Sequence, residues 1–240
     1  MLWCDVPGSL RRRRRHRVSI LNDVENDIEM LRTAENQGDD ITLWKQAEGK
    51  FAHRFSTKRT WEQIRHCHHA CNWSKGIWFT HSTPKYSFLA WIAVRNRLQT
   101  GDRMRLWNAG INTTCILCNE EEETCEHLFF RCMYTAQIWK TLAEGLLQNR
   151  FTTEWRDLIA IITSPGLTPI KNFLVRYTFQ AAIHTVWRER NARRHGEQAR
   201  EAQLLAKFVD KTVRLWLLSL QGRGKMQDGL VTWFGTRMEP

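Results

Sequence analysis

Four cysteines and one histidine lie in the short segment Cys115–Cys132, and they are the side chains of this sequence best suited to bind a metal ion. Cys115 and Cys118 form a Cys-x2-Cys pair, a spacing at which two thiolates can face one ion. His127 and Cys132 come next, where an apolar helical pattern begins. Because zinc prefers four thiolate or imidazole ligands in a tetrahedron, we predict a structural Zn²⁺ site here, and Cys115, Cys118, His127 and Cys132 supply one complete ligand set.

Cys125 is a fifth potential ligand, and it gives a competing set made of Cys115, Cys118, Cys125 and Cys132. Zinc accepts both four cysteines and three cysteines with one histidine, so the residue types alone do not choose between the sets. The segment could also be a group of reduced core cysteines beside a surface histidine. The cysteine pair, the ligand spacing and the start of a helix coincide here, which favours a metal site.

The same segment is acidic, since Glu120–Glu123 and Glu126 lie between Cys115 and Phe130 without any lysine or arginine. Nucleic-acid affinity depends on neutralising phosphates, so this surface should repel a nucleic acid. We therefore expect the metal to hold a pair of helices to the start of the next helix, and the binding of nucleic acid to fall elsewhere.

The elements around the metal segment are predicted to be mainly α-helical. Two short strands, Ile41–Lys45 and Lys50–Phe55, indicate a small N-terminal β-hairpin around a turn at Glu48 and Gly49. Gly101 is expected to end one helix and Asp102 to cap a short one. The helical patterns cover residues 18–31, 56–65, 86–98, 128–147, 151–162, 169–187 and 204–219. The predicted fold is thus a helical domain with a small hairpin and a zinc-knuckle-like loop that leads into a helix.

The chain is basic, with 36 lysines and arginines against 25 acidic residues in 240 and a formal net charge of +11. Such a surplus favours polyanionic partners, above all RNA or DNA. Trp91 and Trp107 lie near the first group of arginines, which suits phosphate contact combined with base stacking. The candidate nucleic-acid-binding residues are Arg95, Arg97, Arg103 and Arg105 in this first group, and Arg188, Arg190, Arg193, Arg194 and Arg200 in a second. Each group could instead be the solvated face of a helix.

The seven cysteines, an odd number gathered at metal-ligand spacing, fit a reducing compartment better than a disulfide framework. No apolar run is long enough to span a membrane, so we expect an intracellular protein without membrane contact. The run Arg11–Arg17 is dense enough in like charge to leave residues 1–17 as a disordered tail. It could act as a nuclear import signal or as a phosphate-contacting arm.

Three stretches resemble the zinc-binding region located after the reverse transcriptase of plant LINE-type (non-LTR) retrotransposons. They are DITLWKQAEGKF from Asp40, YSFLAWIAVRNRLQTGDRMRLW from Tyr86, and CILCNEEEETCEHLFFRCMYTAQIW from Cys115. The later WRERNARRH and LVTWF resemble the segments C-terminal to that region in such elements. The resemblance implies the ligand set Cys115, Cys118, His127 and Cys132, with Cys125 outside it.

The resemblance also implies a domain plan and a function. We expect a tail at 1–17, a helix and linker at 18–38, the reverse transcriptase zinc-binding domain at 39–148, a C-terminal helical region at 149–221 and a tail at 222–240. The polymerase and endonuclease regions that precede this region in the family are not in the sequence, so we expect a C-terminal remnant. The sequence shows no paired catalytic carboxylates, no phosphate-binding glycine loop and no nucleophile with its base, so we expect no enzyme. The expected role is to assist RNA or DNA binding, or else to dock a reverse transcriptase polymerase domain.

Overall fold

The computed structural model describes residues 19–33, 41–66, 69, 71–164, 166–223 and 225–237. The run Arg11–Arg17 lies outside the described residues. The chain divides into two compact units, Met1–His68 and His69–Pro240, which we describe separately. In the described ranges, no helix has both the length and the apolar character needed to cross a bilayer.

The first unit contains α1 (Ser19–Thr33), a hairpin of β1 (Trp44–Lys45) and β2 (Phe51–Ala52), and α2 (Thr57–Ile64). The strands are antiparallel, with Trp44 opposite Ala52, and a 3-10 turn joins them. The side chain of Ser56 caps α2 by accepting a hydrogen bond from the backbone N–H of Arg59. The predicted hairpin is confirmed, although its strands are shorter than expected. None of the described side chains in this unit is buried.

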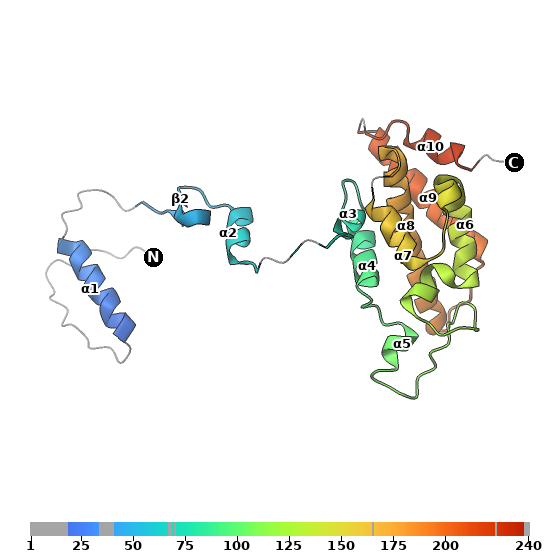
Figure 1. Cartoon of the computed structure of the whole chain (residues 1–240), viewed down its shortest axis with the longest axis horizontal. Helices are drawn as coiled ribbons and strands as arrows, with labels where there is room; N and C mark the ends of the chain where they lie inside the picture. Colours follow the sequence, from blue (N-terminus) through green and yellow to red (C-terminus); the bar gives the residue numbers. More distant parts are fainter. Residues whose placement is uncertain are drawn as a thin grey trace. The chain divides into compact units, whose positions relative to one another are not determined.

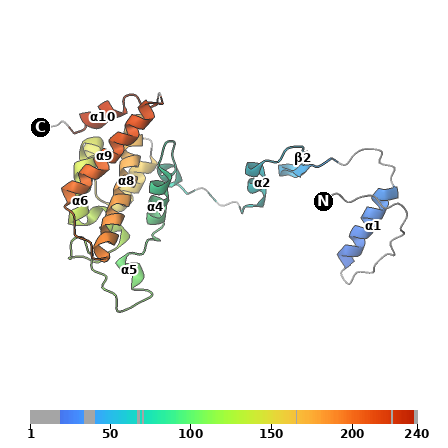
Figure 2. The same ribbon diagram turned by 180° about the vertical axis from the view of Figure 1, so that it is seen from behind.

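The second unit is helical and holds the core. Its elements are α3 (Ser74–Ile77), α4 (Pro84–Val94), α5 (Gly101–Met104), α6 (Met133–Leu147), α7 (Trp155–Thr163), α8 (Pro169–Arg194), α9 (Ala202–Gln221) and α10 (Gly229–Gly235). Figures 1 and 2 show α8 in the middle of this unit, with α4 on one side and α6 and α9 on the other. Both views place α10 across one end of the bundle and α5 near the opposite end. The mainly helical fold class is confirmed.

An aromatic cluster forms the centre of this unit. The ring of Phe130 stacks on that of Phe179 in α8 at a centroid distance of 5.2 Å, and it meets Trp139 of α6 edge-on at 4.9 Å. Trp155 of α7 completes the cluster at 5.9 Å from Phe179. Such pairs add stability beyond the area they bury. Phe130 belongs to the predicted metal segment, so that segment is anchored directly in the core.

The structure corrects the predicted start of three helices. The helix expected over residues 128–147 is interrupted at Cys132, whose backbone is extended, and α6 begins only at Met133. The helix expected from Phe151 starts at Trp155. Gly101 is the first residue of α5 and not a breaker, and the capping position belongs to Thr100.

Candidate metal centre and the surrounding arginines

The structure brings together the side chains of Cys115, Cys118, His127 and Cys132, whose potential ligand atoms all lie within 4.8 Å of one another. Three of the four residues are buried, and Cys118 is partly buried. The Sγ atoms of Cys115 and Cys132 are 4.0 Å apart, and the Sγ of Cys118 lies 3.4 Å from Nε2 of His127. A tetrahedral zinc site with Zn–S bonds of about 2.3 Å has ligand atoms roughly 3.8 Å apart. The donor set therefore fits zinc in both chemistry and spacing.

A tight turn presents the first two cysteines. The backbone N–H of Asn119 donates to the carbonyl of Cys115 at 2.8 Å, and Asn119 has a left-handed backbone with φ of 59°. Asparagine tolerates that conformation better than most residues with a side chain. The N–H of Cys115 in turn donates to the carbonyl of Glu121 at 2.8 Å, so the loop closes on itself before it reaches the other two ligands.

A single π-helical turn, His127–Arg131, presents the other two. The backbone N–H of Cys132 donates to the carbonyl of His127 at 2.7 Å, a bond that spans one residue more than in an α-helix. This wider turn lets residues five positions apart share one site. It also buries Leu128, Phe129 and Phe130 in the core, so ligand placement and core packing depend on the same backbone.

The close contact of two thiols and the position of the imidazole shape the chemistry of the cluster. The contact between the Cys115 and Cys132 thiols lowers the pKa of Cys115 to about 5, with help from the backbone amides of Cys118 and Leu117 and against the effect of burial. The same contact, together with burial, raises the pKa of Cys132. Nδ1 of His127 lies 3.1 Å from a carboxylate oxygen of Glu121, which leaves Nε2 facing the cysteines. This contact is close but does not have hydrogen-bond geometry, since Nδ1 has no hydrogen-bond partner among the described residues. The proximity of Glu121 to His127 was not predicted from the sequence.

Cys125, the alternative ligand, lies outside the cluster. Its thiol donates a hydrogen bond to the carbonyl of Ala93 in α4 at 3.4 Å, and it is 4% exposed. Burial, with added repulsion from Asp102 and Glu126, raises the pKa of this thiol. Its place outside the cluster and its hydrogen bond to α4 separate Cys125 from the four ligand candidates.

Glu123 is fully buried, which differs from the expectation that the acidic residues of this segment all form a surface. Its carboxylate accepts hydrogen bonds from the Arg190 guanidinium of α8, the shortest being 2.5 Å from Nη2, and lies 3.3 Å from Nη2 of Arg194. It also accepts the N–H of Gly101 at 2.9 Å. A buried carboxylate requires such partners, so Glu123 joins the metal loop to α5 and α8.

A second buried carboxylate, Glu189, organises the rest of the second arginine group. It pairs with Arg193 at 2.9 Å and with Arg200 at 2.7 Å. Arg190 is 4% exposed, so the prediction that it lies on a nucleic-acid surface does not fit its burial. Arg193 and Arg194 are only partly exposed and are already paired, whereas Arg188 is exposed. The polar C-terminal end of α8 is thus largely an internal ion-pair network.

The first arginine group lies in α5 and just after the ends of α4 and α5, and most of its members are exposed. Arg95 and Arg97 are exposed just after α4, and the guanidinium of Arg95 lies 5.3 Å from the Trp91 ring centroid. Arg105 is exposed and pairs with Glu122 at 2.8 Å, while Arg103 is partly buried. Trp107, which lies beyond the end of α5, is 65% exposed. We call Arg95, Arg97, Arg105 and Trp107 the α4–α5 surface.

The metal segment lies within a stretch that matches a known family. Residues 55–139 match the family model for zinc-binding in reverse transcriptase. The match runs from just before α2 into α6 and includes all four clustered side chains. No curated protein and no solved structure matches the chain significantly. The donor set and the zinc-binding family model agree on a metal site, and zinc is the metal they indicate.

Proposed function

We propose that this chain is a non-catalytic, zinc-stabilised module that derives from the C-terminal part of a plant LINE-type reverse transcriptase and assists RNA or DNA binding. Zinc is held by Cys115, Cys118, His127 and Cys132. Four protein ligands close a tetrahedral site and leave no position for a reacting water, so its role is structural. The origin is supported by the match over residues 55–139 and by the similar stretches around it.

One observation carries the proposal: the metal loop is bonded to both helices that present the α4–α5 surface. Glu123 accepts the Gly101 N–H of α5 through its side chain, and its carbonyl accepts the Asp102 N–H at 3.2 Å. Cys125 donates to the Ala93 carbonyl of α4. Ordering the loop with a metal therefore fixes the positions of Arg95, Arg97 and Arg105, which lowers the entropy lost when they bind phosphates.

The test is filter binding of short single-stranded RNA and DNA across a salt series. Each phosphate contact contributes about 0.7 to the logarithmic salt slope for a single strand. The double variant Arg95→Gln/Arg97→Gln should lower the slope by about 1–1.5 and the low-salt affinity by about tenfold. The control is Arg156→Gln/Arg223→Gln, which removes the same charge from two exposed arginines outside this surface. Equal losses in both variants, or binding that is indifferent to salt, would overturn the nucleic-acid role.

A second candidate function is docking of a polymerase domain, with no nucleic-acid contact. The observation that favours it is the apolar character of the segment after α5, where Leu106 is 74% exposed and Trp107 is 65% exposed. Co-purification with a reverse transcriptase polymerase domain would test this docking. Tight binding that is lost in Leu106→Ser, together with no affinity for RNA or DNA, would favour docking over the first proposal.

A further inference from the structure

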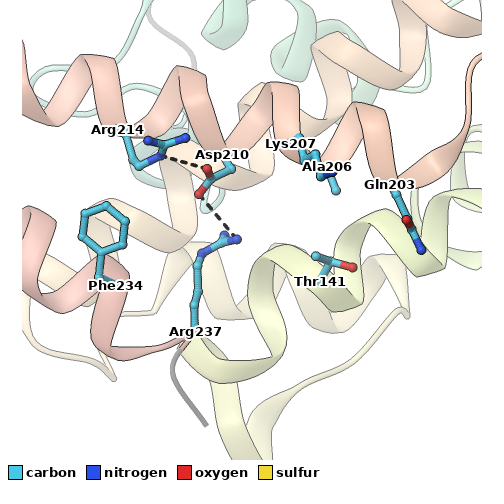
Figure 3. Close-up of a pocket in the computed structure, with 8 residues that line it drawn as sticks. All are labelled: Thr141, Gln203, Ala206, Lys207, Asp210, Arg214, Phe234 and Arg237. Atoms are coloured by element: carbon cyan, nitrogen blue, oxygen red, sulfur yellow. Dashed lines mark hydrogen bonds and ion pairs between the residues drawn. The ribbon is translucent and has the colours of Figure 1, made fainter. Parts of the chain in front are cut away.

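A cleft of about 580 Å³ opens among α6, α9 and α10 of the helical unit. Figure 3 shows the side chains that line it: Thr141, Gln203, Ala206, Lys207, Asp210, Arg214, Phe234 and Arg237. Three of them are cationic, and Asp210 is the one acid among these lining residues. The cleft is of the size that small-molecule sites have.

Asp210 is shared among several donors and cannot neutralise the cations around it. Its carboxylate lies 2.8 Å from Nε of Arg214 and 3.5 Å from Nη1 of Arg237, and it accepts the indole N–H of Trp233 at 2.9 Å. Figure 3 shows the two arginines reaching it from different sides. One negative charge therefore faces two guanidinium groups.

The cations of the lining differ in how far they are paired within the described part of the chain. Lys207 is exposed beside the cleft and has no acidic partner there. Arg237 is 21% exposed, with Nη1 facing Asp210 and Nη2 donating to the carbonyl of Leu142 at 3.4 Å. Burial lowers the pKa of Arg237 against the opposing effect of Asp210, as expected for a cation that is incompletely compensated. The lining thus carries a surplus of positive charge, of which Lys207 is the most open part.

We propose that this cleft binds the phosphate of a nucleotide, with Lys207, Arg214 and Arg237 on the phosphate and Phe234 against the base. Guanidinium groups match phosphate oxygens in geometry and charge. Phe234 lines the same cleft and is 45% exposed, so a planar ring can stack on it. The nucleotide is either free or part of a single strand. The site does not depend on the α4–α5 surface, because none of its residues belongs to that surface.

The experiment is calorimetric titration of the whole chain with adenosine monophosphate, adenosine and inorganic phosphate. We expect the nucleotide to bind and adenosine not to bind. Lys207→Glu should weaken nucleotide binding by about tenfold, since it replaces a charge-assisted contact with repulsion. Lys211→Glu, one turn further along α9 and outside the lining, is the matched control. It should change the nucleotide affinity by less than about threefold. Phe234→Ala should weaken the nucleotide but not inorganic phosphate.

A short oligonucleotide with a 5′-phosphate, titrated into the same variants, distinguishes a free nucleotide from a nucleotide within a strand. If Lys207→Glu weakens oligonucleotide binding and Arg95→Gln/Arg97→Gln does not, the cleft binds a nucleotide that is part of a strand. If Lys207→Glu weakens only monophosphate binding and leaves oligonucleotide binding unchanged, the cleft binds a free nucleotide. No binding of monophosphate, phosphate or oligonucleotide at this cleft, or equal effects of Lys207→Glu and Lys211→Glu, would overturn the proposal.

Discussion

Glu123 and Cys125 lie two positions apart in the metal loop, and both are buried, but burial has opposite consequences for them. The thiol of Cys125 stays neutral and needs only the carbonyl of Ala93. The carboxylate of Glu123 is paired with Arg190 and Arg194 and needs that positive charge to be buried at all. The sequence shows five glutamates in this loop and no sign of which one turns inward.

Replacing Glu123 with glutamine should destabilise the protein strongly. Glu123→Gln leaves two arginines facing a neutral group in the core, and breaking a buried pair costs about 3–5 kcal/mol. Urea unfolding measures the loss. The control is Glu122→Gln, whose exposed pair with Arg105 should contribute less than about 1 kcal/mol. Similar stabilities for the two variants would contradict the role given to Glu123.

His184 of α8 should make the protein less stable in mild acid. Burial, with repulsion from Lys85 and Arg188, lowers its pKa to about 4 from an ordinary value of 6.5. The unfolded chain therefore binds this proton more readily than the folded one, and stability falls as pH drops from about 6.5 towards 4. Allowing for partial exposure, the loss at pH 5 is on the order of 1 kcal/mol.

The comparison of wild type with His184→Gln in urea at pH 7.5 and pH 5 isolates this contribution, since acid release of zinc acts on both proteins. The variant should lose less stability than wild type over this pH interval. An identical loss in both would mean that His184 titrates normally.

At the scale of elements, helix periodicity predicted where most helices lie because one-sided apolar patterns require burial. It missed the π-helical turn His127–Arg131, since one extra residue in a turn leaves no periodic signal. That turn determines which side chain joins the cysteines. This is why the sequence alone left His127 and Cys125 as alternatives, whereas the structure turns one towards the cluster and the other towards α4.

The contact of α6 with the residues just after α10 could not be predicted either, and it depends on Gly145. A Cβ at this position of α6 would collide with the backbone carbonyl of Thr236. Gly145→Ala should therefore cost about 1–3 kcal/mol and displace the segment that carries Arg237. Thermal unfolding and proteolysis of the C-terminal segment measure this. Gly235→Ala, where an added Cβ meets no atom within 4 Å, is the control and should be neutral or slightly stabilising.

At the scale of the whole molecule, metal binding is expected to stabilise one side of the second unit more than the other. The metal segment contacts α4, α5 and α8, and its π-helical turn packs on α6, whereas α9 packs on α6 and α8. Removing zinc with a chelator should lower hydrogen-exchange protection over residues 93–132 by far more than in α9, because metal affinity contributes directly to folding at such sites. Uniform loss of protection across the unit would show that the metal supports the entire core.

The basic composition predicts a polyanionic partner, but it does not say which arginines would face that partner. Net charge carries no information on the arginines that are consumed inside the fold. Arg190, Arg193 and Arg200 are paired with the buried acids Glu123 and Glu189, so part of the positive surplus serves structure. The arginines of the α4–α5 surface are more exposed, and their role as phosphate contacts stays a prediction.

The zinc content of purified protein, compared among wild type, Cys118→Ser, His127→Ala and Cys125→Ser, tests the central claim most directly. We expect one zinc per chain in wild type and in Cys125→Ser, since serine can still donate to the Ala93 carbonyl. Cys118→Ser and His127→Ala should lose most of the metal at neutral pH. Full zinc retention in His127→Ala together with loss in Cys125→Ser would contradict the ligand set and the structure of the site.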